Sequence, residues 1–138
     1  MLYRVLFAGV VAVSACGQKS FSTPVSTRTS AGPDETFACV KKQLGELGYR
    51  QTSQDVAELR VTATKIDLKS RRADTQFRRM LNKLEVDVAA EADGQTSIEA
   101  LGQTFAEYAT HRGPTEQQEK ASEQVKADVQ VLLDRCRS

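Results

Sequence analysis

The chain has few of the residues from which metal and redox centres are usually built. Among 138 residues there is one histidine, His111, and there are three cysteines. A zinc site takes three or four ligands from cysteine, histidine and carboxylate side chains. The sequence also contains no glycine-rich phosphate loop, no Gly-x-Ser-x-Gly motif and no Cys-x-x-Cys pair. We therefore expect no metal, no cofactor and no catalytic site of these kinds.

A long hydrophobic run is also missing. The longest uncharged apolar stretch, residues 5–15, has eleven residues, whereas a membrane-spanning helix needs roughly 20. It follows Arg4 and turns polar directly after Cys16. A short positive segment followed by an apolar run of this length is typical of a secretory signal peptide. We predict a cleaved signal over residues 1–15.

The last residues of that stretch form a short motif. Val13, Ser14, Ala15 and Cys16 place an aliphatic residue and two small residues before a cysteine, which resembles the lipobox of bacterial lipoprotein precursors. The resemblance implies cleavage before Cys16, diacylglycerol on its sulfur and usually a further acyl chain on its new amino group. Several acyl chains hold a protein on a membrane firmly. Gly17 follows where enteric lipoproteins kept in the inner membrane have aspartate, so the resemblance favours the outer membrane, facing the periplasm.

If Cys16 carries lipid, two thiols remain. Cys39 and Cys136 would lie in an exported chain, and the oxidising compartments that receive exported proteins favour disulfides. The two cysteines therefore predict one bridge that closes almost the whole domain into a loop. The alternative is two free buried cysteines, which are common in protein cores.

Residues 16–33 are rich in serine, threonine and glycine and lack apolar periodicity, which predicts a flexible tether. Residues 34–138 are expected to form one globular domain. Its first helix should begin with Asp34 as N-cap and stop at Gly48, and its last should begin at residues 114–115, where Thr115 and Gln118 have capping-box spacing, and run to Cys136.

Alternating apolar residues predict three strands between these helices, over residues 59–64, 84–91 and 96–108, with a tight turn at Asp93-Gly94 and a bulge near Gly102. Residues 71–82 could form a short helix or a long loop. The predicted class is α+β: an α-β-β-β-α two-layer sandwich, with both helices on one face of a three-stranded antiparallel meander and joined by the disulfide.

Charge is balanced overall but uneven along the chain. Without Arg4, 18 lysines and arginines face 18 aspartates and glutamates, which argues against a nucleic-acid partner. Residues 65–83 hold seven basic residues and two acidic ones. Arginine pairs can bind phosphate or carboxylate through bidentate forks, and the alternative is a charged segment that keeps the sheet soluble. The candidates for binding an anion or a partner are Lys69, Arg71, Arg72, Arg78 and Arg79.

Glu85, Asp87, Glu91 and Glu99 are expected near one sheet face, and glycoside hydrolysis uses a carboxylate pair. A three-stranded sheet offers no deep cleft, so we expect no enzyme. The sequence favours a lipid-anchored cell-envelope protein, a non-catalytic binding or assembly module that contacts an envelope protein or an anionic polymer or lipid. The alternatives are a hydrolase of envelope polymers and a purely structural surface lipoprotein. Nothing in the sequence indicates the oligomeric state.

Overall fold

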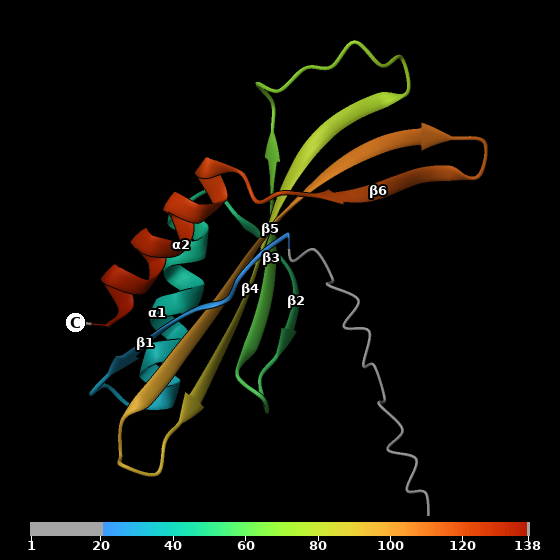
Figure 1. Ribbon diagram of the computed structural model, residues 1–138. Helices are drawn as coiled ribbons and strands as arrows, with labels where there is room; N and C mark the ends of the chain where they lie inside the picture. The colour runs from blue at the N-terminus through green and yellow to red at the C-terminus, as the bar shows by residue number, and fades with distance from the viewer. Residues whose placement is uncertain (1–20, 138) are drawn as a thin grey trace, which may run out of the picture.

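The computed structural model describes residues 21–137. Within this range, two helices lie on one face of a six-stranded antiparallel sheet. The elements follow one another as β1 (Val25–Thr29), α1 (Pro33–Glu46), β2 (Arg50–Asp55), β3 (Arg60–Asp67), β4 (Phe77–Ala90), β5 (Thr96–Thr110), β6 (Gly113–Glu119) and α2 (Glu123–Cys136). The strand order is β1-β5-β4-β3-β2, and β6 also pairs with β5. Figure 1 shows the helices side by side, with β4, β5 and β6 extending beyond them.

The predicted α+β class with both helices on one sheet face is confirmed, and so is the disulfide. Cys39 in α1 and Cys136 at the end of α2 are bonded, with their Cα atoms 5.8 Å apart. The predicted meander corresponds to β3, β4 and β5. The sheet is larger than the predicted three strands, because β1, β2 and β6 extend it on both sides.

The N-cap of helix α1 lies two residues earlier than predicted. Gly32 is the N-cap and Pro33 the first helical residue, so Asp34 lies inside the first turn. Proline suits this position because its fixed φ is already helical, and because a backbone N–H here would have no partner within the helix. The helix stops where predicted: Gly48 has φ +88°, and the N–H of Tyr49 donates to the carbonyl of Leu44.

Helix α2 begins later than predicted. The segment around Thr115 is strand β6, which pairs with β5, so the capping-box spacing from Thr115 to Gln118 was misleading. The true N-cap is Ser122, whose hydroxyl accepts a hydrogen bond from the N–H of Val125. The capping side chain therefore comes three residues after the end of the last strand.

The predicted tether over residues 16–33 is too long. Val25–Thr29 forms strand β1, which pairs with Thr96–Ala100 of β5 and whose last residue, Thr29, is buried. Backbone hydrogen bonds to the edge of β5 hold this segment, although its side chains show no apolar pattern. The predicted signal, Cys16 and the start of the tether lie outside the described residues.

Strands β4 and β5 form a long hairpin whose turn at Asp93-Gly94 is confirmed, with Gly94 at φ +83°. The predicted bulge near Gly102 is wrong, because the pairing of β5 with β4 runs through this residue without a shift. Gly102 instead lies under α2. A Cβ atom there would stand 3.1 Å from methyl groups of Val125 and Val129, so glycine allows the helix to approach the sheet closely.

The loop alternative for residues 71–82 is partly right. The chain is a loop over residues 68–76, and β4 begins at Phe77; no helix forms.

The core lies between the sheet and the helices. Its fully buried large side chains include Val40, Leu44, Val61, Leu84, Val86, Ile98, Val125 and Leu132.

Candidate functional site

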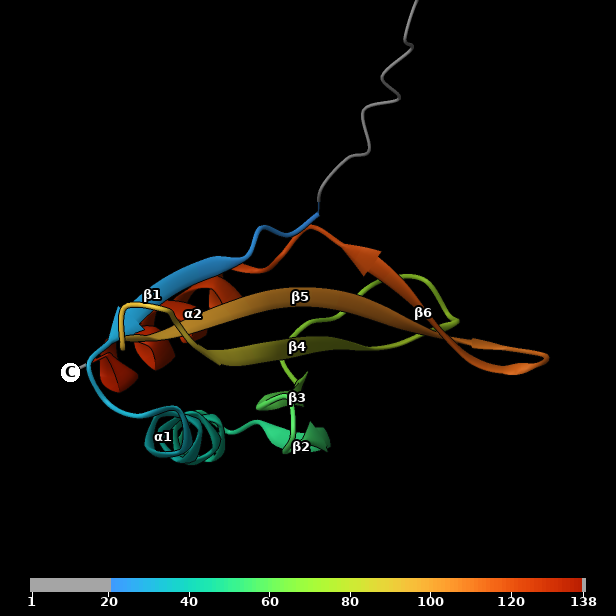
Figure 2. The same ribbon diagram turned by 90° about the horizontal axis from the view of Figure 1, so that it is seen from below.

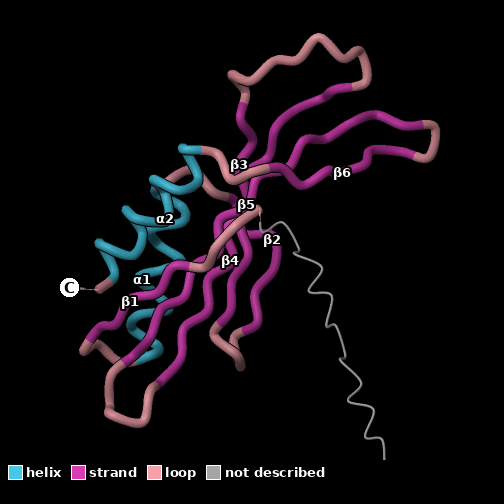
Figure 3. The backbone as a smooth tube through the Cα atoms, viewed as in Figure 1, coloured by secondary structure: helices cyan, strands magenta, loops and turns pink. Residues whose placement is uncertain are grey.

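The predicted basic segment, residues 65–83, lies where the sheet extends beyond the helices. We call this part the wing: residues 77–82 of β4, residues 104–110 of β5, and β6. The loop of residues 68–76 leads into it from β3 (Figure 3).

Arg72 is held by partners on the wing. Its guanidinium binds both carboxylate oxygens of Glu119, donates to the hydroxyl of Tyr108 over 2.9 Å and lies 5.4 Å from the ring centroid of Phe77. The hydrogen bonds to Glu119 and Tyr108 raise the pKa of Arg72. This arginine attaches its loop to β5 and β6.

Two other basic residues of β4, Arg79 in the wing and Lys83 just beyond it, are paired on the other sheet face. Arg79 Nε lies 3.2 Å from the buried carboxylate of Glu107, and Lys83 Nζ lies 2.6 Å from Glu116. Arg79 is opposite Glu107 in the strand register, and Tyr108 follows Glu107, so Arg72 and Arg79 use opposite sheet faces. The structure therefore places two of the predicted binding residues, Arg72 and Arg79, on opposite sheet faces.

The three other candidates are exposed. Arg71 donates to the carbonyls of Leu68 and Ser70 in its own loop. The backbone N–H of Lys69 donates to Asp67, and the hydroxyl of Ser70 makes a second bond to that carboxylate.

The bond from Ser70, with the backbone N–H of Lys69, lowers the pKa of Asp67. Within residues 21–137, the side chain of Arg78 makes no hydrogen bond or ion pair. A binding role for these five residues stays a prediction.

Glu85, Asp87 and Glu99, three of the carboxylates expected near one sheet face, lie on the face that the helices leave uncovered, which we call the open face. Asp87 is opposite Glu99 in the register of β4 and β5. Arg60 Nε lies 2.6 Å from Asp87 and 3.9 Å from Glu85, and the hydrogen bond to Asp87 raises the pKa of Arg60. Glu85 and Asp87, two of the four carboxylates expected near one sheet face, are thus part of a solvent-facing ion-pair network.

The open face is hollowed where it meets the wing. The hollow has a volume of about 750 Å³ and lies over β2, β3, β4 and the paired ends of β5 and β6. Both charge signs and apolar side chains meet in it. Its lining includes Arg50, Thr62, Thr64, Ile66, Arg79, Leu81, Lys83, Glu107 and Glu116.

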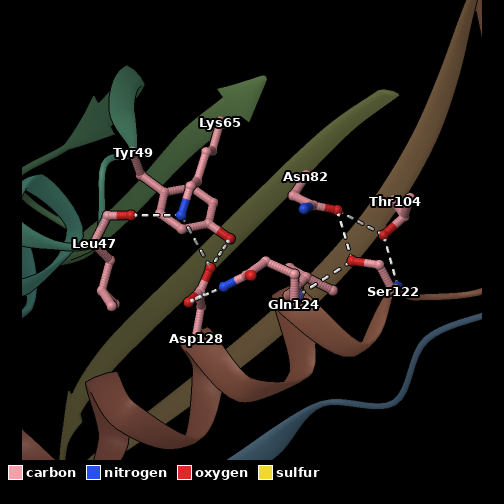
Figure 4. A network of polar contacts seen from close by, with 9 residues as sticks. Leu47, Tyr49, Lys65, Asn82, Thr104, Ser122, Gln124 and Asp128 are labelled. Carbon is pink, nitrogen blue, oxygen red and sulfur yellow. Dashed lines mark hydrogen bonds and ion pairs between the residues drawn. The ribbon is translucent and has the colours of Figure 1, made fainter. Parts of the chain in front are cut away.

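A buried polar network that the sequence did not predict joins the helices to the sheet (Figure 4). The Tyr49 hydroxyl donates to Asp128 over 2.8 Å, and the side-chain amide of Gln124 donates to the same carboxylate over 2.9 Å. Lys65 Nζ lies 3.7 Å from Asp128 and donates to the carbonyl of Leu47 over 2.8 Å. Every member therefore has a partner.

Burial, the hydrogen bond to Asp128 and the charge of Asp128 together raise the pKa of Tyr49. The phenol therefore remains a hydrogen-bond donor well into alkaline solution. Because Tyr49 and Asp128 are both buried and already paired, we assign this network the structural role of holding α2 against the sheet.

A second network fixes the start of α2. Asn82 accepts hydrogen bonds from the hydroxyls of Thr104 and Ser122, over 2.8 Å and 3.0 Å. The backbone N–H of Ser122 donates to Thr104 over 2.9 Å. The N-cap of α2 is thereby bonded to both strands at the base of the wing (Figure 4).

The described part of the chain offers little for metal chemistry. Over residues 21–137, no three His, Cys, Asp or Glu side chains come together in a group that could hold a metal ion. No helix in the same range is long and apolar enough to cross a membrane.

A comparison with protein families finds no family model that matches the chain, and a comparison with curated proteins finds no match.

Proposed function

We propose that the protein is a lipid-anchored, non-catalytic module of the bacterial cell envelope that binds another envelope protein in the hollow of its open face. The lipobox-like motif ending at Cys16 supports the anchor, which would place the domain at the outer membrane, facing the periplasm. The observation that carries the binding role is the hollow of about 750 Å³ beside the wing.

The side chains of the hollow favour a protein partner over an anionic polymer. Arg79 and Lys83 already pair with Glu107 and Glu116, so a polyanion would meet two carboxylates beside the cations it needs. A protein surface can present both charge signs in a complementary arrangement. Ile66, which is 41% exposed at the edge of the hollow, adds apolar contact.

The same geometry gives little support to a hydrolase. Glu85 and Asp87 share Arg60 on the open face, where water screens them. A general acid with a raised pKa is normally enclosed in an apolar pocket. A binding module is therefore the better account of this face.

Photo-crosslinking in intact cells tests the proposal. The variant Ile66→p-benzoylphenylalanine places the photoreactive group at the hollow, and Lys42→p-benzoylphenylalanine places it on the exposed side of α1. We expect a defined protein adduct, identified by mass spectrometry, from position 66 and none from position 42. Equal adducts from both positions, or adducts of position 66 with glycan or lipid alone, would contradict a protein partner in the hollow.

A further inference from the structure

An apolar groove lies at the sheet edge opposite β2, between β1 and β6. Both of these strands pair with the same edge of β5, β1 with its residues 96–100 and β6 with its residues 104–110, while β4 pairs with the other edge. The stretch between these pairings runs beneath α2. The groove there has a volume of about 730 Å³, and its apolar lining is Phe21, Val25, Gly102, Ala121, Val125 and Val129.

Positive charge borders this groove. Lys120, just before α2, and Lys126, on its first turns, are exposed and belong to the lining. Lys126 also contacts Glu123 over 3.1 Å, three residues away on the helix. An exposed pair of this kind is weak, so Lys126 can still meet an external anion.

The groove also lies where the described chain begins. Phe21 is 46% exposed, and its carbonyl accepts a hydrogen bond from the N–H of Ala121 over 3.2 Å. Cys16 precedes Phe21 by five residues, which can span at most about 18 Å even when fully extended. An acyl anchor on Cys16 would therefore keep the bilayer surface within reach of Phe21 and the groove.

We propose that this edge of the domain docks on the bilayer: Phe21 and the apolar groove contact the interfacial region of an anionic phospholipid membrane, and Lys120 and Lys126 contact its phosphates. An aromatic side chain beside lysines is the composition that favours membrane interfaces. The inference rests on the proposed anchor at Cys16. In Figure 2 the edge with β1 and β6 lies at the top and α1 and β2 at the bottom, so docking turns β2 away from the membrane.

A single tryptophan can report the docking, because the chain has none of its own. The full-length Phe21→Trp variant, made with its signal and purified from membranes, is placed in vesicles of phosphatidylcholine and phosphatidylglycerol whose acyl chains are brominated. We expect blue-shifted emission that the bromines quench severalfold. The matched control is Val56→Trp in the β2–β3 turn, a position 63% exposed at the opposite sheet edge, which should remain unquenched.

A second experiment tests whether the two lysines contribute to the docking. Adding Lys120→Glu and Lys126→Glu to Phe21→Trp should reduce the quenching toward the level of the Val56→Trp control, and circular dichroism checks that the fold is kept. Quenching that survives these changes would overturn the role of the lysines. Phe21→Trp emission that is blue-shifted but unquenched would mean that protein, such as a second copy, covers the groove, which overturns the proposal.

The intact mass of the same sample shows whether Cys16 is acylated, and so distinguishes a failure of the docking from a failure of the anchor. An acylated Cys16 combined with unquenched Phe21→Trp emission overturns the docking alone. A chain without acyl groups overturns both the docking and the proposed anchor.

Discussion

Replacing both Cys39 and Cys136 with alanine should lower the free energy of unfolding by about 4 to 5 kcal/mol. The bridge joins residues 97 apart in sequence, and the chain-entropy model assigns about 4.7 kcal/mol to a loop of ~100 residues. The bridge also links the two helices that cover the sheet. Urea denaturation followed by circular dichroism measures the change in midpoint and slope.

Both cysteines are replaced because a single free thiol could form a bridge between chains. The matched control is the reductant: dithiothreitol should shift the midpoint of the native protein to that of the double variant and leave the double variant unchanged. A double variant with the native midpoint would show that the loop constraint contributes little and that the helices are held by packing alone.

The second large effect is expected for Asp128→Ala, which should lower the free energy of unfolding by about 3 kcal/mol. The side chain of Asp128 is only 6% exposed and accepts hydrogen bonds from Tyr49 and Gln124. Its removal leaves the buried Tyr49 hydroxyl without an acceptor, and an orphaned buried polar group costs about 1–3 kcal/mol, more when a charged partner is lost. Thermal and urea denaturation give the measurement.

Asp134→Ala is the matched control on the same helix. Asp134 is exposed, and the one ion pair that its carboxylate makes with the described residues is with Arg137, at 3.5 Å, three residues away. Such a pair contributes at most about 0.5 kcal/mol, so this variant should unfold like the native protein. Equal effects of Asp128→Ala and Asp134→Ala would mean that the buried network does not stabilise α2.

The sequence predicted the strands whose side chains alternate in polarity, and it missed the strands that are held mainly by backbone hydrogen bonds. β4 shows its buried face directly, because Leu84, Val86 and Val88 all point to the helices. In β2 every residue is exposed, and in β6 no side chain is fully buried. Such edge strands are specified by hydrogen bonds to a neighbour, which a local pattern of apolar residues does not reveal.

Part of the candidate site depends on these missed strands. The partners of Arg72 and Lys83 are Glu119 and Glu116 in β6, a segment that the sequence assigned to the last helix. Without β6, the excess of basic residues over residues 65–83 had no visible counter-charge and therefore predicted an anion-binding patch. The hollow could not be predicted either, because it needs the registers of five strands at once.

The buried network had one signal in the sequence. Asp128 lies between Val125 and Val129 on the helix stripe that also holds Leu132, and all four residues are buried. A carboxylate at such a position needs a hydrogen-bond partner. The partner, Tyr49, follows the stop of α1 and is 79 residues away, so only the fold could identify it.

The proposed function depends most on the anchor, because a lipobox-type signal that ends at Cys16 would account both for the export of the domain and for the edge that would face the bilayer. Cys16 lies outside the described residues, and the intact mass of the protein purified from bacterial membranes tests it directly. We predict a chain that begins at Cys16 and is heavier than its amino-acid mass by a diacylglyceryl group and one further acyl chain. A chain that still begins at Met1, or one that carries no lipid on Cys16, would contradict the account.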